Sequence, residues 1–352
     1  MSIVKFSEVA HRAYTREDRF NTEKIYYVGG EHIDSCELYV TKKGVIKGST
    51  IGPMFYCGFT AGQILFVTRN PHLKKCSIAD FDGICSEKTF VIETKDESIL
   101  TQEYLAIIMQ SDDFWNYCEE NKSGGVNYFL NWSTLADYEF ELPPIKQQLE
   151  IAQKVMSAYR LKQSYKKLLD ATREMVKSQF IEMFKGDNQV PLGDICNIEK
   201  GATITRNDVL PGEVPVVAGG QEPSCYHNVA NREAGAITVS ASGAYAGYIN
   251  FWNCPIFASD CNTIISKDDE KTDQTFVYLG LRAMQKQIYG LQKGGAQPHV
   301  YGKDLQKFMF PCPSYAKQIE FSKMAKQADK SEFELRKSIE AIDQVIKSLI
   351  NN

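Results

Sequence analysis

The sequence predicts an α+β protein in which two similar mixed α/β domains are separated by two long helices that pair as an antiparallel coiled coil. Three observations lead to this prediction. The second half of the chain repeats residues of the first, a long stretch without Gly or Pro follows the first copy, and a similar stretch follows the second. With 352 residues the chain is long enough for two domains of average size. The expected boundaries are 1–143 for the first domain, 144–185 for the central helix, 186–313 for the second domain and 314–352 for the C-terminal helix.

The composition is that of a folded protein, and its net charge is not positive enough to attract nucleic acid over the whole surface. Charged residues make up 24%, apolar residues 43%, and 40 basic against 44 acidic residues leave a net charge of −4. No apolar run approaches the ~20 residues of a membrane span, and the N-terminus lacks a signal-peptide core. The ten cysteines are dispersed without a CxxC pair, so we expect reduced thiols, a cytoplasmic location and no metal site.

The repeat is clearest late in each half. At an offset of 170 residues, Gly124-Gly125 corresponds to Gly294-Gly295, and further identities follow in the same register without a gap. They are Leu135 with Leu305, Phe140 with Phe310, Pro143 with Pro313, Gln148 with Gln318 and Glu150 with Glu320. Earlier segments match at other offsets: Phe6–Val9 resembles Leu192–Ile195 at 186, and Gly44, Ser49 and Gly52 match Gly235, Ser240 and Gly243 at 191. The changing offset indicates loops of different length on a shared scaffold.

Each predicted domain contains short runs of β-branched and aromatic residues bounded by Gly and Asn, which is typical of a small twisted sheet. The runs are 25–28, 63–67 and 89–92 in the first domain and 214–217, 235–239 and 262–265 in the second. A helical pattern follows in each domain, over about 101–119 and about 275–289.

The two long helices are predicted from the absence of Gly and Pro and from apolar periodicity. Pro143-Pro144 suit a first helical turn, and Gly186 suits the position after a helix end. In the central helix one seam runs through Ile145, Leu149, Ala152, Met156 and Tyr159, and a shifted seam through Leu161, Tyr165, Leu168, Thr172 and Met175. The C-terminal seam is a heptad pattern with one polar interruption, through Phe321, Ala325, Ala328, Glu332, Leu335, Ile339, Ile342, Ile346 and Leu349. Antiparallel pairing is expected; the alternative is that each helix packs only on its own domain.

Motifs of catalysis are missing. The sequence has no GxxxxGK[ST] loop, GxGxxG turn, HExxH, GxSxG or kinase motif, and its five histidines are scattered. The double proline Pro143-Pro144 is not preceded by Asn or Asp, as the loop of an amino-methyltransferase would be. We therefore expect a protein that binds and is not an enzyme.

These motifs in this order resemble the specificity (S) subunit of type I restriction–modification systems, over essentially the whole chain. The first copy runs from Gly124-Gly125-Val126-Asn127 to Pro143-Pro144 and Gln147-Gln148. The second runs from Gly294-Gly295-Ala296-Gln297-Pro298-His299 to Pro313 and Gln318, and the segments 218–223 and 239–248 are also similar to the family. Three residues depart from the family pattern: Gln147 and Lys317 replace a usual Glu, and Cys312 replaces a common proline.

The resemblance implies that each domain is a target-recognition domain that reads one half of a bipartite, asymmetric site in double-stranded DNA. The helices would fix the unread spacer and dock two modification (methyltransferase) subunits, and restriction (translocase and nuclease) subunits would join them. S-adenosylmethionine, ATP and Mg²⁺ would belong to those partners, with no cofactor or metal in this chain. The rival interpretation is a non-catalytic coiled-coil scaffold without a DNA target; a self-sufficient enzyme is disfavoured by the missing motifs.

The charge distribution bears on this function. Residues 1–145 carry 14 basic and 21 acidic side chains, 186–315 carry 10 and 13, and 316–352 carry 7 and 6, whereas 146–185 carry 9 and 4. Phosphate contacts supply most sequence-independent affinity, so we expect weak DNA binding by the isolated chain and tight binding only with the modification subunits. The basic side chains of the central helix would follow spacer phosphates, meet a partner or simply stay solvated. They are Lys154, Arg160, Lys162, Lys166, Lys167, Arg173 and Lys177.

Candidate DNA-facing residues are polar, basic or glycine-adjacent positions in the loops of the two domains. In the first domain they are Lys42, Lys43, Lys47, Ser49, Lys122 and Asn127. In the second they are Thr203, Thr205, Arg206, Gln221, Tyr226, His227, Ser242, Tyr245, Lys293, Gln297 and His299.

Overall fold

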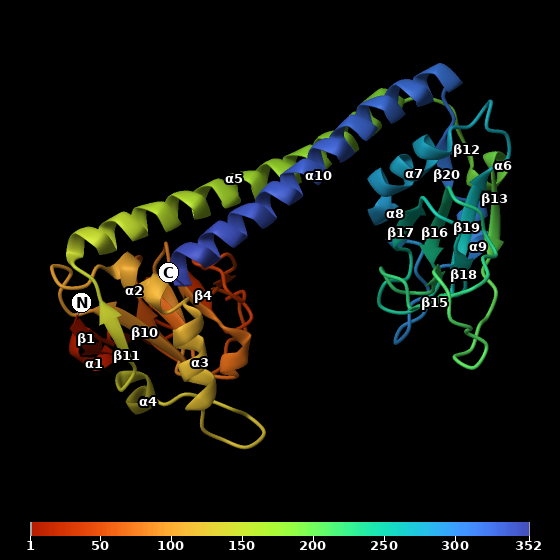
Figure 1. The fold of residues 1–352 in the computed structure, drawn as a ribbon. Coiled ribbons are helices and arrows are strands. Elements are labelled where there is room, and N and C mark those ends of the chain that lie inside the picture. Colours follow the sequence, from red (N-terminus) through yellow and green to blue (C-terminus); the bar gives the residue numbers. More distant parts are fainter. Residues whose placement is uncertain (1, 352) are drawn as a thin grey trace. The chain divides into compact units, whose positions relative to one another are not determined.

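The structure, a computed structural model, describes residues 2–351 and divides into two compact units. Unit 1 contains the residues up to Tyr165 together with those from Lys337 onward, and unit 2 contains Lys166–Arg336. Each unit consists of one globular part and one stretch of each long helix (Figure 1).

Unit 1 is built on two sheets. The first is a four-stranded antiparallel sheet in the order β2 (Ala10–Arg12), β10 (Thr89–Thr94), β7 (Ile64–Val67) and β8 (Cys76–Ile78). The second has the order β3 (Thr15–Arg16), β6 (Phe55–Phe59), β9 (Gly83–Ser86), β4 (Tyr26–Val28) and β5 (Gly44–Val45), and β4 and β9 run parallel. A separate pair joins β1 (Ser2–Lys5) to β11 (Glu139–Leu142).

Four short helices complete the globular part of unit 1: α1 (Phe6–Val9), α2 (Gln102–Ile108), α3 (Asp112–Glu120) and α4 (Trp132–Ala136), with a 3₁₀ turn at Pro71–Leu73. The helix predicted over about 101–119 is thus two helices. It breaks because the Ser111 side chain accepts a hydrogen bond from the Phe114 backbone and caps α3. Phe66 of β7 stacks on Trp115 of α3, with ring centroids 5.8 Å apart, which fixes α3 over the first sheet.

Unit 2 repeats this arrangement, and the predicted repeat is confirmed. Its four-stranded sheet has the order β13 (Cys196–Lys200), β19 (Cys261–Ser266), β16 (Ala236–Ser240) and β17 (Ile249–Trp252). A three-stranded sheet has the order β15 (Cys225–His227), β14 (Val214–Val217) and β18 (Phe257–Ala258), and β12 (Gln189–Pro191) pairs with β20 (Met309–Pro311). The helices are α6 (Leu192–Ile195), α7 (Gln274–Ala283), α8 (Gln285–Tyr289) and α9 (Gly302–Gln306).

One equivalence expected from the sequence is wrong. Gly235, just before β16, corresponds to Gly62, just before β7, and both have a positive φ, at 91° and 95°. Their carbonyl oxygens accept matching hydrogen bonds from Gln274 Nε2 (2.9 Å) and Gln102 Nε2 (3.0 Å). Gly44, which the sequence aligns with Gly235 at an offset of 191, lies instead in β5. The error arises because unit 1 has an additional strand, β6, between β5 and β7, which changes the offset to 173.

The first turn of each long helix carries a buried glutamine that ties the helix to its own globular part. In unit 1, Gln148 is 0% exposed; its Nε2 donates to Ile99 O (2.8 Å) and Pro143 O (2.9 Å), and its Oε1 accepts from Thr101 N (3.1 Å). In unit 2, Gln318 repeats the pattern with Lys271 O (3.0 Å), Pro313 O (3.0 Å) and Asp273 N (2.9 Å). These bonds form although Gln147 and Lys317 replace the usual Glu.

The long helices, α5 (Ile145–Phe184) and α10 (Tyr315–Asn351), lie within the ranges 144–185 and 314–352 and pair antiparallel in each unit. In unit 1, Val155 and Tyr159 of α5 belong to a core that Ile346 and Leu349 of α10 complete. In unit 2, Phe180 and Phe184, near the end of α5, pack on Phe321, near the start of α10, at centroid distances of 5.4 and 5.6 Å. The pairing therefore agrees with the coiled-coil prediction, and the alternative of separate packing is wrong.

The predicted seam of α10 is confirmed, but the second seam of α5 is not. Leu161, Leu168 and Met175 are 45%, 51% and 46% exposed, whereas Lys162 and Leu169 are 7% and 8% exposed. The face of α5 that contacts α10 therefore does not move to the predicted second seam. Charged residues occupy positions on this face and pair with acids on α10. Lys162 lies 2.7 Å from Asp343 in unit 1.

Candidate DNA interface

The two units share a hairpin turn between two helices. We call residues 123–129, between α3 and α4, the unit 1 turn, and residues 293–299, between α8 and α9, the unit 2 turn. Two backbone hydrogen bonds close each: Ser123 and Phe129 exchange bonds of 2.8 and 2.9 Å, and Lys293 and His299 exchange bonds of 2.9 and 2.8 Å. Figure 1 shows the segment between α3 and α4 extending away from the sheets of unit 1.

The first glycine of each turn is required by geometry. Gly124 and Gly294 have φ values of 99° and 98°, a region that L side chains rarely adopt. A Cβ there would lie 2.7 Å from Asn127 O and 2.8 Å from Gln297 O. The second glycines, Gly125 and Gly295, have open space around the same position. The two turns therefore hold the same backbone shape and present the next residues identically.

The tips of the turns are exposed and lack net charge. Val126 is 91% exposed, and Asn127, Ala296 and Gln297 are exposed as well. Two lysines at the turns are paired with acids: Lys122, directly before the unit 1 turn, lies 2.6 Å from Glu119, and Lys293, the first residue of the unit 2 turn, lies 2.7 Å from Asp304. The hydrogen bond from Lys293 lowers the pKa of Asp304, which keeps that carboxylate ionised.

The unit 1 turn rests on the loop that follows β7. Asn70 N–H donates to Tyr128 O (2.9 Å), Leu130 N–H donates to Thr68 O (3.0 Å), and the Arg69 guanidinium lies 5.1 Å from the centre of the Phe129 ring. Arg69 is thus a functional candidate that the sequence reasoning missed. At the correct offset of 173, Arg69 corresponds to Ser242, which is among the predicted DNA-facing residues; the wrong offset of 191 hides this equivalence.

The unit 2 turn rests on the equivalent loop after β16. Gly243 N–H donates to Pro298 O (3.1 Å), and Ser242 donates to the carboxylate of Asp260. His299 stacks on Tyr301 at 5.9 Å, and Tyr301, also missed from the sequence, is 45% exposed.

A third loop reaches the same end of unit 2. A Cβ on Gly219 would lie 2.7 Å from Ser242 O, so the loop that carries Gln221 runs beside the Ser242 loop. The backbone oxygen of Gln221 accepts a hydrogen bond from Asn250 Nδ2 (3.1 Å), and the residue is exposed. Tyr245, in the Ser242 loop, is 47% exposed. The structure therefore brings together the loops of Gln221, Ser242, Tyr245, Gln297 and His299.

Other candidates of unit 2 lie elsewhere or are buried. Thr203, Thr205 and Arg206 are exposed on the loop between β13 and β14, where Thr205 Oγ1 donates to Asp208 (2.6 Å). His227 is not exposed as expected: it is 7% exposed, its Nδ1 accepts a hydrogen bond from Leu210 N–H (3.0 Å), and its ring packs on Phe257. Its neighbour Tyr226, which points to the other side of β15, is 55% exposed.

The basic candidates of unit 1 around β5 already have neighbours. Lys42 lies 2.6 Å from Asp34, and the Lys43 ammonium lies 3.9 and 4.1 Å from the ring centres of Tyr26 and Phe81. Lys47 is exposed, whereas the hydroxyl of Ser49 donates to Ile46 O (2.7 Å) and stabilises its own turn. Lys42 and Lys43 therefore already interact with an acid or with aromatic rings, which weakens their attraction for a DNA phosphate.

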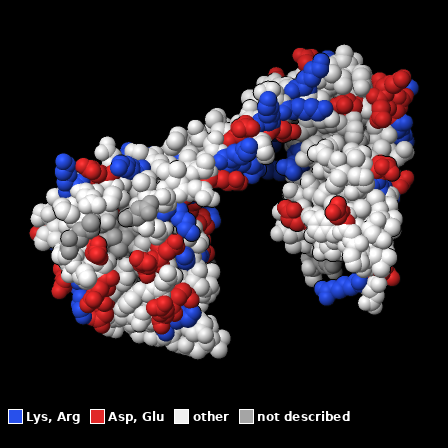
Figure 2. Space-filling model, in the orientation of Figure 1, with Lys and Arg blue, Asp and Glu red and all other residues white. Residues whose placement is uncertain are grey.

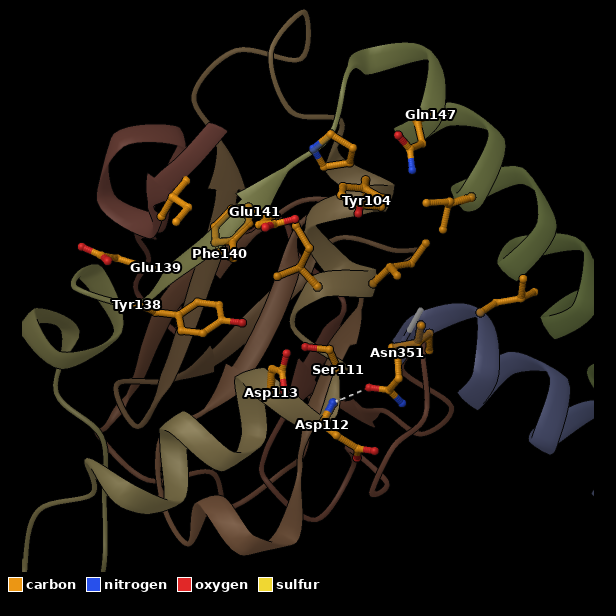
Figure 3. A pocket seen from close by; sticks show the side chains of 17 residues that line it. Tyr104, Ser111, Asp112, Asp113, Tyr138, Glu139, Phe140, Glu141, Gln147 and Asn351 are labelled. Carbon is orange, nitrogen blue, oxygen red and sulfur yellow. Dashed lines mark hydrogen bonds between the residues drawn. The ribbon is translucent and has the colours of Figure 1, made fainter. Parts of the chain in front are cut away.

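A pocket of about 760 Å³ lies in unit 1 between β11, α2, the start of α5 and the end of α10 (Figure 3). The Asn351 side chain closes one side and accepts a hydrogen bond from Asp112 N–H (2.7 Å), at the first turn of α3. Its lining includes Asp112, Asp113, Glu139 and Glu141. These carboxylates would repel phosphates, so we do not assign the pocket to the DNA interface.

The rest of the described chain shows no sign of a metal site or a membrane segment. Among residues 2–351, no three His, Cys, Asp or Glu side chains are placed to hold a metal ion. No helix in that range is long and apolar enough to cross a membrane. The ten thiols are free, and burial raises the pKa of Cys196 and Cys261 to about 12.

Comparison with known proteins agrees with this geometry. Residues 186–344 match the family described as the type I restriction modification DNA specificity domain. The type I restriction enzyme EcoDI specificity subunit of Escherichia coli is 26% identical over 133 residues, which are 37% of this chain and 29% of that protein. The match thus spans under a third of the relative's length.

Two solved structures share the fold over 99% of this chain. The type I restriction–modification S subunit from M. genitalium has a TM-score of 0.65 at 15% identity, with 94% of that chain covered. A chain from a study of complex assembly and conformational transition of the type I R-M system has a TM-score of 0.59 at 18% identity, with 96% covered. Residues 186–344 therefore match the DNA specificity domain of type I restriction–modification systems, and the chain shares the fold of a solved S subunit.

Proposed function

We propose that this chain is the non-catalytic DNA-recognition subunit of a type I restriction–modification complex, and that each unit reads one half of a bipartite, asymmetric site. The observation that carries the proposal is the duplication of one exposed turn, with the same backbone shape, on the same sheet order in both units. A scaffold without a DNA target would have no need for two such turns.

The helices are proposed to fix the unread spacer and to dock two modification subunits. Half-site separation is a matter of geometry, and the antiparallel contacts of α5 and α10 within each unit favour a fixed register. The modification subunits would bring S-adenosylmethionine, and restriction subunits would bring ATP and Mg²⁺. The complex would act on double-stranded DNA in the cytoplasm.

The charges support weak DNA binding by the isolated chain. Several basic side chains of α5 are engaged with acids: Lys162 with Asp343, and Arg173 with Glu332 (3.0 Å). On the face shown in Figure 2, the globular part of unit 2 is largely free of charged groups. Phosphate contacts supply most of the non-specific affinity for DNA. The modification subunits would therefore provide much of that affinity, while this chain selects the sequence.

The test is co-expression with the modification subunit, followed by sequencing of methylated bases in the host genome. A new bipartite methylated-adenine motif is expected, whereas unchanged methylation would favour the scaffold interpretation. Gel shifts on a duplex with that motif should show tight binding only when the modification subunit is present. Nanomolar specific binding by the isolated chain at physiological salt would contradict the proposed division of roles.

A further inference from the structure

We infer that each turn reads one A·T base pair from the major groove. In this reading the amide of Asn127 or Gln297 binds the adenine edge, and the preceding Val126 or Ala296 contacts the thymine methyl group. The inference rests on the proposed function and deepens it, because it assigns a base to two particular side chains.

The first step is that the two amides hold the same place. Asn127 and Gln297 each stand three residues after the glycine with positive φ, and the carbonyl oxygen of each lies against that glycine. The closing hydrogen bonds of the two turns agree within 0.1 Å, so the Cα–Cβ bonds of the two amides start from equivalent positions. Both side chains are exposed.

The second step is the chemistry of the tips. An amide offers an acceptor and a donor side by side, which matches adenine N6–H and N7, whereas guanine prefers Arg or Lys and cytosine prefers a carboxylate. Neither turn presents a free cation or a carboxylate at its tip, because Lys122 and Lys293 are paired with Glu119 and Asp304. The tips therefore favour adenine over the other bases and hydrogen bonding over phosphate attraction.

The third step is the apolar residue beside each amide. Val126 is 91% exposed at the end of an ordered turn, and Ala296 occupies the matching position. In the major groove the thymine paired with the adenine displays its C5 methyl group next to the adenine edge. Valine covers more of a methyl group than alanine does, so unit 1 should depend on that methyl more strongly than unit 2.

The experiment begins with the methylated motif of the wild-type complex, which gives both half-sites. Duplexes are then prepared in which one adenine at a time is replaced by 7-deazaadenine, which lacks N7, and one thymine at a time by uracil, which lacks the methyl. Binding is measured by fluorescence anisotropy with the complex of this chain and the modification subunit, at one fixed salt concentration.

In each half-site, one adenine position should show weaker binding both with 7-deazaadenine and with the alanine variant of the turn amide. We expect 7-deazaadenine there to weaken wild-type binding about tenfold, as a bidentate contact predicts, and Asn127→Ala or Gln297→Ala to weaken it similarly. The two changes combined should cost no more than either alone. Asn127→Gln and Gln297→Asn should restore part of the binding, and Val126→Ala should reduce the effect of uracil in the first half-site.

The outcomes separate the inference from the proposed function. Gln147→Ala, an exposed amide outside the turns, is the matched control and should bind like wild type. If wild type yields no bipartite motif, the proposed function fails. If it does, but the turn variants keep full affinity and still respond to every 7-deazaadenine, the inference alone is overturned. Loss of co-purification with the modification subunit in Asn127→Ala or Gln297→Ala would also overturn it, by making the turn a protein contact.

Discussion

The buried glutamines at the starts of the long helices allow a quantitative test of how each helix is anchored. Gln148→Ala removes three hydrogen bonds at a side chain that is 0% exposed. At about 1 kcal/mol per bond, unit 1 should lose about 3 kcal/mol of unfolding free energy. Gln318→Ala should cost unit 2 about the same, because its three bonds match in partner type and length.

The assay is unfolding in urea, followed by circular dichroism and by the fluorescence of the three tryptophans. Trp115 and Trp132 report on unit 1, and Trp252 reports on unit 2. Each variant should therefore shift the transition of its own unit, and melting should move by about 6–12 °C for a unit of this size.

Two comparisons make the result decisive. Gln148→Met keeps the side-chain length without the bonds and should be destabilised like the alanine variant. Gln147→Ala changes the exposed neighbour in the same turn and should stay within about 0.5 kcal/mol of wild type. If Gln148→Ala also stays within about 0.5 kcal/mol, the helix is not anchored by this side chain and the reasoning fails.

Three further predictions concern the turns, the helix pair and a surface loop. Gly124→Ala and Gly294→Ala should disturb their turns and reduce methylation of the native site at least several-fold, because the new Cβ would lie within 2.8 Å of a carbonyl oxygen. The control variants Gly125→Ala and Gly295→Ala should be tolerated. Equal methylation in all four variants would show that the positive φ is dispensable. Lys162→Ala should destabilise unit 1 by about 3 kcal/mol, because it leaves Glu37 and Asp343 without the cation between them. Lys154→Ala, at an exposed position, should have little effect in the same urea titration. Equal unfolding midpoints for the two variants would refute this role for Lys162. Arg206→Ala and Gln221→Ala should reduce methylation of the native site without lowering the melting temperature, and unchanged methylation in a variant would remove that residue from the interface.

The repeat, the sheet strands and both long helices could be predicted because their signals are local. Gly and Pro are absent throughout the long helices, and the identities in the second half of each copy fall in one ungapped register. Each of the six predicted strand runs overlaps a strand of the two units. Apolar periodicity was also sufficient for α10, whose seam has only one polar interruption.

The predictions from the sequence are wrong where a polar side chain, and not an apolar one, determines the helix contact or the helix end. The contact face of α5 includes Lys162, whose hydropathy is that of a surface residue but which is 7% exposed and pairs with Asp343 on α10. The break between α2 and α3 is made by a single hydroxyl, that of Ser111, inside a stretch with good helical periodicity. Such positions are fixed by a partner distant in the sequence.

The candidate site was predicted in part. The two turns follow from the glycine pairs, but Arg69 depends on the correct alignment of β7 with β16, which an inserted strand obscured. The burial of His227 was not predictable, because its imidazole is held by the backbone of Leu210, seventeen positions earlier.

The composition of unit 1 from both ends of the chain has a consequence for biosynthesis. Its core includes Val155 and Tyr159, which need Ile346 and Leu349 for cover, while all of Lys166–Arg336 is translated in between. At about 5–20 residues per second, the ribosome needs roughly 10–35 s for that interval. Unit 2 is contiguous, so its sheets can form before the last helix emerges. Unit 1, although translated first, is completed last, and the apolar face of α5 that packs on α10 stays uncovered during that interval.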